Sequence, residues 1–281
     1  MSELSMTPTA GIGIAVAQFA PTTDQAGNLA AIRELTSRAS SRGAQVVVFP
    51  EYSSYFIDPF DASLAEYAED IDGPFVTGLQ AIALDHRVVI VAGLVERAGV
   101  SGRIHNTVIA VDGSNTLATY RKQHLYDAFG QRESDWVEAG DTGAPQTFAY
   151  GGLRFGLQTC YDIRFPEVTR TLVDAGADVV LVAAEWVRGP LKEHHWLTLL
   201  TARAIENTVF VVAADQPPPL GVGHSVIIDP AGVTMASVGT TTDVAVSFLD
   251  RDTLERVRTV NPALALRRYR VEPVSHGSGS D

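Results

Sequence analysis

The chain has 281 residues, of which 46% are hydrophobic, so it is long enough to bury a sizeable core as one large domain or two small ones. Its 33 acidic residues outnumber its 21 Lys and Arg residues and give a net charge of −12, and the one notable basic cluster, residues 267–270, is short. We therefore expect neither nucleic acid nor an anionic membrane as a partner.

The apolar stretch at residues 11–20 does not have the form of a secretory signal. A secretory signal carries positive charge before its apolar core, whereas the first basic residue here is Arg33. No apolar run approaches the length of a membrane span either. We expect a cytoplasmic protein whose cysteine stays reduced.

The first half of the chain alternates strand-like and helix-like segments. Short apolar and β-branched runs predict strands at residues 11–19, 45–49, 88–94, 104–111 and 117–120. Between them, residues 24–40 and 73–85 have the spacing of helices. In the first of these helices Leu29, Ile32 and Leu35 fall on one side.

The second half repeats this alternation. Strands are predicted at residues 153–159, 179–183 and 208–213, helices at 165–175 and 192–206, and hairpin-like runs at 225–228 and 244–249. About a dozen strands and two pairs of helices suit either two mixed sheets packed face to face with helices outside, or one doubly wound sheet.

No linker divides the middle of the chain, so residues 11–274 are expected to form a single domain. The segments 1–10 and 275–281 are rich in small and polar residues. We expect both of these terminal segments to be disordered.

Cys160 is the only cysteine and directly follows the apolar run at residues 153–159. A lone cysteine cannot form an intrachain disulfide, so it is either a buried apolar residue or a functional thiol. The first of these is the more common case. The residues that follow two other predicted strands favour a functional thiol at Cys160.

Glu51 and Lys122 also follow strand-like runs, at residues 45–49 and 117–120. If these strands lie side by side with the Cys160 strand, a carboxylate, an amine and a thiol meet in one crevice. A thiol with a pKa of about 8.5 is mostly protonated at neutral pH and needs a base or a cation to become a nucleophile. Taken singly, Glu51 would be a solvated carboxylate and Lys122 part of an exposed basic turn.

Several motifs resemble the nitrilase, or carbon–nitrogen hydrolase, superfamily. They are Phe-Pro-Glu (49–51), Tyr-Arg-Lys-Gln-His-Leu-Tyr-Asp (120–127), Glu-Ser-Asp-Trp-Val-Glu-Ala-Gly (133–140), Cys-Tyr-Asp-Ile-Arg-Phe-Pro-Glu (160–167), Ala-Arg-Ala-Ile-Glu-Asn (202–207) and Gly-His-Ser-Val-Ile-Ile-Asp-Pro (223–230). The resemblance covers roughly residues 11–250. It implies an α/β fold, the four-layer α-β-β-α sandwich of two mixed sheets flanked by helices.

The resemblance also implies a catalytic set. Cys160 is the expected nucleophile, Glu51 the base, and Lys122, with the backbone N–H of Tyr161, the expected donor to an oxyanion, at about 3 kcal/mol per donor. Glu133 corresponds to the additional glutamate of the family, which supports the lysine and helps to position substrate. The alternative for Glu133 is a surface carboxylate beside Arg132.

The motif at residues 160–167 resembles the branch of ω-amidases and deaminated glutathione amidases, because true nitrilases usually follow the cysteine with Trp-Glu-Asn. We therefore predict a thiol hydrolase that cleaves the C–N bond of a small carboxylic acid amide through a Cys160 thioester and releases ammonia. Nitrile hydrolysis and N-carbamoyl amide hydrolysis are alternatives. An inactive regulatory or interaction protein on the same scaffold is an alternative of another class.

Substrate recognition is predicted at Arg164 and Trp186. A guanidinium grips a carboxylate with two parallel hydrogen bonds, and the resemblance puts Arg164 where the substrate carboxylate is recognised. Its alternative is a surface ion pair with Asp162 or Glu167. Trp186 is either a wall of the pocket or part of the core. The segment 183–186 and the loop 216–223 depart from the family pattern.

No cofactor or metal is expected. His194 and His195 are neighbours on a predicted helix, so their side chains diverge by roughly 100° and cannot chelate one ion together. The HExxH spacing is absent, and Gly11 and Gly13 lack the third glycine of a dinucleotide-binding loop.

A homodimer is the expected assembly. The resemblance implies that the helices at residues 165–175 and 192–206 pair across a two-fold axis. Leu197, Leu199 and Leu200 flank this surface, with intrachain core as their alternative role.

Overall fold

The computed structural model describes residues 11–100 and 102–274. The segments 1–10 and 275–281, for which we predicted disorder, lie outside these described residues. The strands are β1 (Ile12–Gln18), β2 (Val46–Val48), β3 (Val89–Arg97), β4 (Ile104–Val111), β5 (Thr116–Arg121), β6 (Thr147–Tyr150), β7 (Leu153–Thr159), β8 (Val179–Ala183), β9 (Phe210–Ala214), β10 (Val226–Ile228), β11 (Thr234–Ser237) and β12 (Asp243–Leu249). The helices are α1 (Gln25–Ser41), α2 (Pro74–His86), α3 (Pro166–Asp174), α4 (Lys192–Asn207) and α5 (Arg251–Val260), with short 3-10 helices η1 (Ala62–Tyr67), η2 (Glu133–Asp135) and η3 (Cys160–Arg164).

The strands form two mixed sheets. The first sheet has the order β12-β1-β2-β3-β4-β5, and the second sheet has the order β11-β10-β9-β8-β7-β6. In each sheet three parallel strands, β1-β2-β3 and β7-β8-β9, are flanked by antiparallel ones. Parallel neighbours need a crossover, and α1, α2, α3 and α4 supply the four crossovers, which is why helices alternate with these strands in the sequence.

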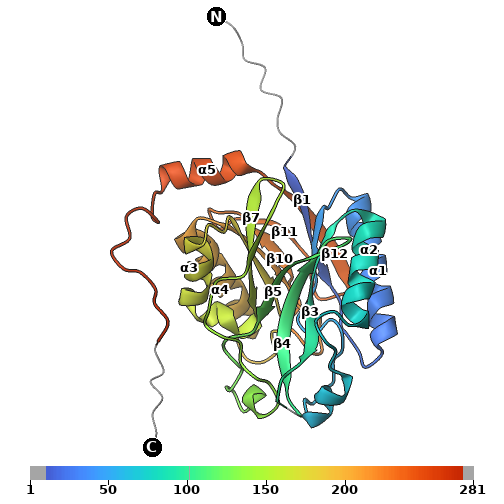
Figure 1. Ribbon diagram of the computed structural model, residues 1–281. Coiled ribbons are helices and arrows are strands. Elements are labelled where there is room, and N and C mark those ends of the chain that lie inside the picture. Colours follow the sequence, from blue (N-terminus) through green and yellow to red (C-terminus); the bar gives the residue numbers. More distant parts are fainter. Residues whose placement is uncertain (1–10, 101, 275–281) are drawn as a thin grey trace, which may run out of the picture.

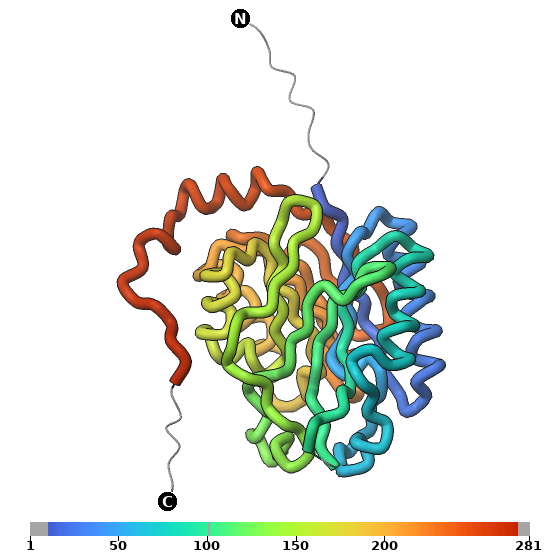
Figure 2. The backbone as a smooth tube through the Cα atoms, viewed as in Figure 1, coloured from blue at the N-terminus to red at the C-terminus, as the bar shows by residue number. Residues whose placement is uncertain are grey.

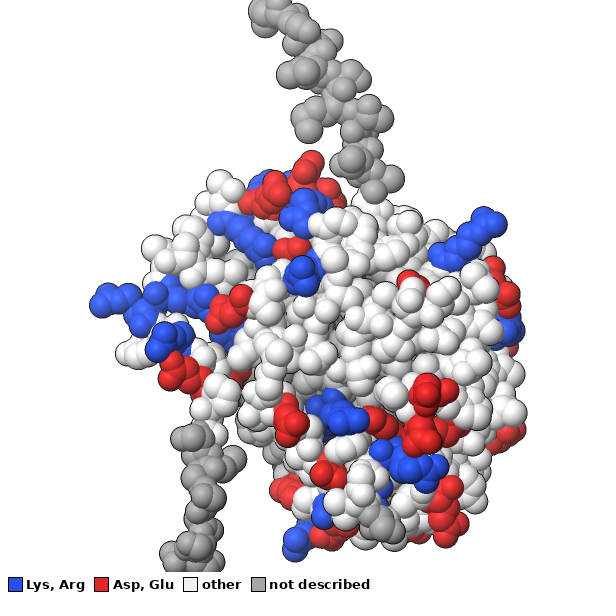
Figure 3. Space-filling view, in the orientation of Figure 1, with Lys and Arg blue, Asp and Glu red and all other residues white. Residues whose placement is uncertain are grey.

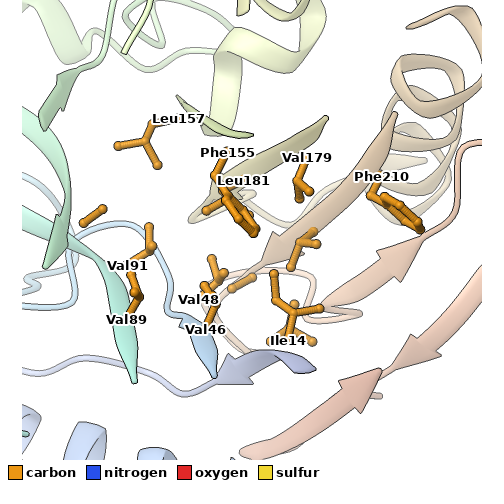
Figure 4. Packing of buried hydrophobic residues seen from close by; sticks show 14 of the residues in the cluster. Ile14, Val46, Val48, Val89, Val91, Phe155, Leu157, Val179, Leu181 and Phe210 are labelled. Carbon is orange, nitrogen blue, oxygen red and sulfur yellow. The ribbon is translucent and has the colours of Figure 1, made fainter. Parts of the chain in front are cut away.

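The two sheets pack face to face through alternate residues of their strands. In β1, Ile14 and Val16 point between the sheets, whereas Ala15 and Ala17 face the helices. Figure 4 shows this layer, with Ile14, Val46, Val48, Val89 and Val91 of the first sheet opposite Phe155, Leu157, Val179, Leu181 and Phe210 of the second. Each such side chain, fully buried, contributes about 1.5–3 kcal/mol of hydrophobic free energy.

The helices form the two outer layers, as Figure 1 shows. Leu35 of α1 and Leu79 of α2 pack on the outer face of the first sheet, and Leu172 of α3 and Trp196 of α4 pack on the outer face of the second. The predicted four-layer α-β-β-α sandwich is confirmed, and the doubly wound single sheet is excluded.

After β12 the chain runs outside the four layers. Helix α5 lies along one end of the sandwich, where Leu254 is buried in the core between the sheets, and residues 261–274 continue past α3 (Figure 2). Arg267 pairs there with Asp174 at 2.6 Å. The sequence prediction missed α5, a mostly polar helix in which Leu254 is the single buried residue. It also missed β6 and β11, which are short strands at the edge of the second sheet.

Acidic and basic side chains are interspersed on the face seen in Figure 3, apart from basic groups gathered at the C-terminal segment. There Arg170, Arg267, Arg268 and Arg270 line a shallow depression. None of the helices within residues 11–100 and 102–274 combines the length and the apolar character needed to cross a bilayer.

The three strands that deliver Glu51, Lys122 and Cys160 do not lie side by side in one sheet. Glu51 follows β2, and Lys122 follows β5, which is separated from β2 by β3 and β4 in the first sheet. Cys160 follows β7 of the second sheet. The three residues therefore come together from two facing sheets. We had considered a crevice between neighbouring strands of one sheet, and the site lies instead at the end of the sandwich.

Candidate active site

A cavity of about 220 Å³ collects most of the residues that the sequence singled out. Its lining includes Glu51, Lys122, Glu133, Cys160, Tyr161 and Trp186. Glu51, Cys160 and Trp186 come from loops that follow parallel strands of the two sheets, which is where open α/β sheets form ligand sites.

Cys160 stands at a sharp turn between strand and helix. Strand β7 ends at Thr159, and η3 begins with Cys160 itself, whose φ of 44° lies in the left-handed region. A non-glycine residue in this region is strained and persists only where the surroundings enforce it. Tyr161 is the next residue of η3, so its backbone N–H belongs to the first turn, which has no acceptor within the helix.

Asp162 ties this turn to the first sheet. Its carboxylate is fully buried and accepts hydrogen bonds from the backbone N–H of Thr159 at 3.2 Å and from the Tyr120 hydroxyl at 2.7 Å. It also accepts from the backbone N–H of His124 at 3.1 Å and lies 2.9 Å from the His124 ring. Asp162 therefore holds the Cys160 turn against the segment that carries Lys122.

The backbone of Glu185 contacts both Glu51 and Cys160. Its N–H donates to Glu51 Oε2 at 2.6 Å, and its carbonyl oxygen accepts from Cys160 Sγ at 3.4 Å. The carboxylate of Glu51 and the thiol of Cys160 are therefore held on either side of one residue's main chain.

Lys122 lies between two buried carboxylates. Its Nζ is 2.9 Å from Glu51 Oε1 and 2.9 Å from Glu133 Oε2. Asn106 Nδ2 donates to the same two side chains, at 2.6 Å to Glu51 and 3.0 Å to Glu133. The Tyr52 hydroxyl donates to Glu133 at 2.7 Å. Buried charges require such pairing, and Lys122, Glu51 and Glu133 supply it to one another.

Burial raises the pKa of the Cys160 thiol well above its usual range, and the nearby Glu51 raises it further, although Lys122 opposes them. The thiol is therefore protonated at neutral pH and needs a base. Burial also raises the pKa of Glu51, while Lys122 lowers it. A carboxylate with a raised pKa beside a protonated thiol is suited to accept its proton.

The other two charges stay fixed. Burial disfavours the charge on Lys122, but Glu133 and Glu51 outweigh it and hold the pKa of the ammonium well above its usual value. Burial would raise the pKa of Glu133, but Lys122 and the N–H donors outweigh it and lower that pKa. The surface alternative for Glu133 is wrong, since the residue is only 6% exposed.

Trp186 fills both of the roles considered for it. It lines the cavity and is also buried, with its indole N–H donating to the carbonyl oxygen of Lys192 at 2.9 Å. Arg164 is not among the residues that line the cavity; its guanidinium lies 4.9 Å from the Trp186 ring. None of the ion pairs within the described ranges joins it to Asp162 or Glu167. Its carboxylate-binding role stays a prediction.

Several residues of the site were missed from the sequence. Asn106 comes from the middle of the regular strand β4, and nothing in the local sequence marks it. Glu185 was noted as a departure from the family pattern, but its backbone contacts follow from tertiary structure. Lys192 also lines the cavity. It is one of two lysines in the sequence, and this rarity could have marked it as a candidate site residue. Within residues 11–100 and 102–274 no group of His, Cys, Asp and Glu has an arrangement that could hold a metal ion.

Comparisons with known proteins found similar sequences and similar structures. The family model described as carbon-nitrogen hydrolase matches residues 13–259. The chain is 35% identical over 257 residues to a deaminated glutathione amidase of Escherichia coli O157:H7, which covers 91% of this chain and 97% of that protein. It is 29% identical over 277 residues to an omega-amidase of Mus musculus, which covers 92% of this chain and 97% of that protein.

The solved structures that resemble this one include an amidase from Nesterenkonia sp., with a TM-score of 0.75 and 28% sequence identity. That likeness covers 92% of this chain and 97% of the other. The similarity therefore extends over nearly the full length of both proteins rather than over the motifs alone.

Proposed function

The chain belongs to the carbon–nitrogen hydrolase family, and we propose that it cleaves the C–N bond of a small carboxylic acid amide through a thioester on Cys160. Its relatives of similar length include amidases, among them a deaminated glutathione amidase and an omega-amidase. The single observation that carries the mechanism is the pair of contacts at Glu185, whose N–H donates to Glu51 and whose carbonyl oxygen accepts from Cys160.

In the first half-reaction the sulfur of Cys160 attacks the amide carbon while Glu51 accepts the thiol proton. A C–S bond forms, and the carbonyl oxygen becomes an oxyanion that accepts hydrogen bonds from Lys122 and from the backbone N–H of Tyr161. When the oxyanion collapses, the C–N bond breaks and Glu51 returns the proton to the nitrogen, which leaves as ammonia.

In the second half-reaction water attacks the thioester. Glu51 takes one proton from the water as the C–O bond forms, and the same oxyanion donors act again. Collapse breaks the C–S bond and returns the proton from Glu51 to the sulfur, which frees the carboxylic acid and restores the resting thiol. Glu133 keeps Lys122 charged while Glu51 carries the proton, because Glu133 lies beside it and has a lowered pKa.

The alternatives use the same residues on other substrates. A nitrile, an N-carbamoyl amide and a primary amide would all react at Cys160, and an inactive protein on this scaffold would react with none of them. An ammonia-release screen of small monoamides, nitriles and carbamoyl compounds distinguishes these four cases.

We expect turnover of amides by the native protein and a loss of about 10⁴-fold or more in kcat for Cys160→Ala. The variant should stay folded, because it removes one small side chain at a cavity wall, and thermal unfolding checks this. Acid quenching of the native enzyme during turnover should trap an acyl group on Cys160, detected by peptide mass. Turnover by Cys160→Ala close to that of the native protein would overturn the mechanism.

A further inference from the structure

The chain uses lysine only inside the cavity. Lys122 and Lys192 are the two lysines of the sequence, all other basic residues being arginines, and both lysines are buried and line the same cavity. The exposed basic side chains in Figure 3 are therefore arginines. Lys122 has its two carboxylates, so the second lysine requires its own explanation.

Lys192 is a buried cation without an acidic partner. It is 5% exposed, and its Nζ donates to the Tyr126 hydroxyl at 2.7 Å. Three aromatic rings surround the ammonium, with centroids at 4.2 Å for Phe129, 4.9 Å for Tyr126 and 5.4 Å for Trp186. None of the ion pairs formed by the described residues includes Lys192.

This environment leaves the positive charge only partly compensated. Aromatic faces attract a cation, but they replace its lost hydration less fully than a carboxylate does. A second cation adds to the imbalance, because the Arg164 guanidinium lies over the same Trp186 and Phe129 rings, at 4.9 and 5.6 Å. Burial and Arg164 together lower the pKa of Lys192. A bound anion would reduce both the desolvation cost of the Lys192 ammonium and its repulsion with Arg164.

The anion does not come from the catalytic carboxylates, because Glu51 and Glu133 are already engaged by Lys122, Asn106 and backbone N–H groups. The other two acidic residues of the lining, Asp58 and Glu185, form no ion pair with Lys192 among the described residues, and burial raises the pKa of Glu185 well above its usual value. The cavity thus has a compensated part at Lys122 and a cationic part at Lys192 that is only partly compensated, and the exposed Arg188 also lines it. A ligand that places an uncharged amide at Cys160 and a negative group at Lys192 would match both.

We infer that Lys192 is a specificity-determining residue that pairs with a carboxylate on the acyl chain of the substrate, so that the enzyme selects anionic amides. The inference rests on the proposed function. It reassigns to Lys192, which lines the cavity, the carboxylate recognition that the sequence had suggested for Arg164. Arg164 then contributes a second positive charge near the same aromatic rings.

The first test compares kcat/KM for monoamides of straight-chain dicarboxylic acids of increasing length with that for their neutral methyl esters. Lys192→Met, which keeps the length of the side chain, should lower kcat/KM for the charged amides by about 10- to 100-fold, the worth of a charged hydrogen bond. It should change the values for the neutral esters by less than about threefold. Lys192→Arg should restore part of the preference for charged amides.

Arg164→Gln is the matched control, since it removes the other positive charge that lies near the Trp186 ring. It should lower the preference for charged amides less than Lys192→Met does. Equal losses on charged and neutral substrates in Lys192→Met would assign Lys192 a structural role and overturn the inference. A preference lost in Arg164→Gln and kept in Lys192→Met would overturn it too.

A second test does not depend on turnover. Alkylation of Cys160 by ω-halo carboxylic acids and by their neutral primary amides should favour the acids in the native protein, and Lys192→Met should remove this preference. If the native protein hydrolyses no amide but shows this Lys192-dependent preference, the proposed function fails and the inference holds. If it hydrolyses neutral amides and shows no preference for either charge in either assay, the function holds and the inference fails.

Discussion

Three buried glutamates around Cys160 differ in pKa because burial raises each pKa and their partners oppose it to different extents. Glu133 accepts from Lys122, Tyr52 and a backbone N–H, which outweigh burial and lower its pKa. Burial and Glu133 raise the pKa of Glu51 although Lys122 opposes them. For the carboxyl group of Glu185 no hydrogen bond is found within the described residues, and burial, with Glu51 and Asp215 adding to it, raises its pKa well above the usual value. Burial and the neighbouring carboxylates therefore favour the protonated, neutral form of Glu185.

Replacing Glu185 by Gln should make the protein relatively more stable as the pH rises. The folded state holds a proton on Glu185 that the unfolded state releases above its ordinary pKa of 4.5, so unfolding becomes more favourable with increasing pH up to the raised folded pKa. Glutamine is neutral in both the folded and the unfolded state, so the variant does not lose stability in this way as the pH rises. The free energy of unfolding from urea titrations should therefore differ between variant and native protein by an amount that grows between pH 5 and pH 8.

Glu255→Gln is the control for this effect, because it makes the same substitution at a side chain that is 63% exposed. Its difference from the native protein should stay nearly constant over the same pH range. A constant difference for Glu185→Gln as well would contradict the neutral state of Glu185 in the folded protein.

At the scale of elements, the turn from β7 into η3 presents the nucleophile, and Asp162 fixes that turn. Four donors converge on a carboxylate with no exposed surface, from Thr159, Tyr120 and His124. A positive φ at a non-glycine residue such as Cys160 costs about 1–3 kcal/mol. The hydrogen bonds to Asp162 offset this cost. Asp162 is thus a positioning residue, which acts on the reaction through Cys160.

Asp162→Asn should destabilise the protein by about 2–4 kcal/mol, because an amide of the same shape turns an N–H group toward donors that then lose their acceptor. It should also lower kcat more than it raises KM, since the sulfur is displaced while the cavity walls remain. Urea unfolding and steady-state kinetics measure the two effects. The milder Tyr120→Phe removes one of the four donors and should cost about 1 kcal/mol. Equal losses for the two variants would show that the carboxylate does not organise the turn.

At the scale of the whole molecule, the helices proposed for dimerisation expose part of their apolar surface. Leu197 of α4 is 39% exposed and Ile205 is 46% exposed, whereas Leu200 is fully buried against the second sheet and Leu199 packs partly on the same cluster. Leu200 therefore belongs to the intrachain core. Leu197 and Ile205 are exposed, so the predicted two-fold pairing through α3 and α4 can be tested directly.

We expect the native protein to have the mass of a dimer by light scattering at micromolar concentration. Leu197→Glu should shift this mass toward that of the monomer, because it places a charge in the predicted interface. Leu84→Glu is the control, since Leu84 is 62% exposed on α2, on the other side of the sandwich. A monomeric native protein, or an equal response to both variants, would rule out this interface.

The sequence alone predicted most of the elements, because strand and helix periodicities are local properties. The periodicities left two layerings open, and the family resemblance implied the four-layer one. Residues 24–40 and 192–206, for example, were expected to be helical, and α1 and α4 occupy Gln25–Ser41 and Lys192–Asn207. It missed α5, a mostly polar helix in which only Leu254 is buried. The family motifs brought Glu51, Lys122, Glu133 and Cys160 to attention, and these residues do line one cavity.

The tertiary structure decided which groups meet and in what state of charge. Glu51 and Lys122 come from strands that are not neighbours, and Cys160 comes from the facing sheet, so their proximity depends on how the two sheets pack. Asn106 and the backbone of Glu185 joined the site for the same reason. The sequence determined which reactive groups the chain carries, since residue type fixes their chemistry. The packing of the sheets alone determined their burial and partners, because these depend on contacts between residues far apart in the chain.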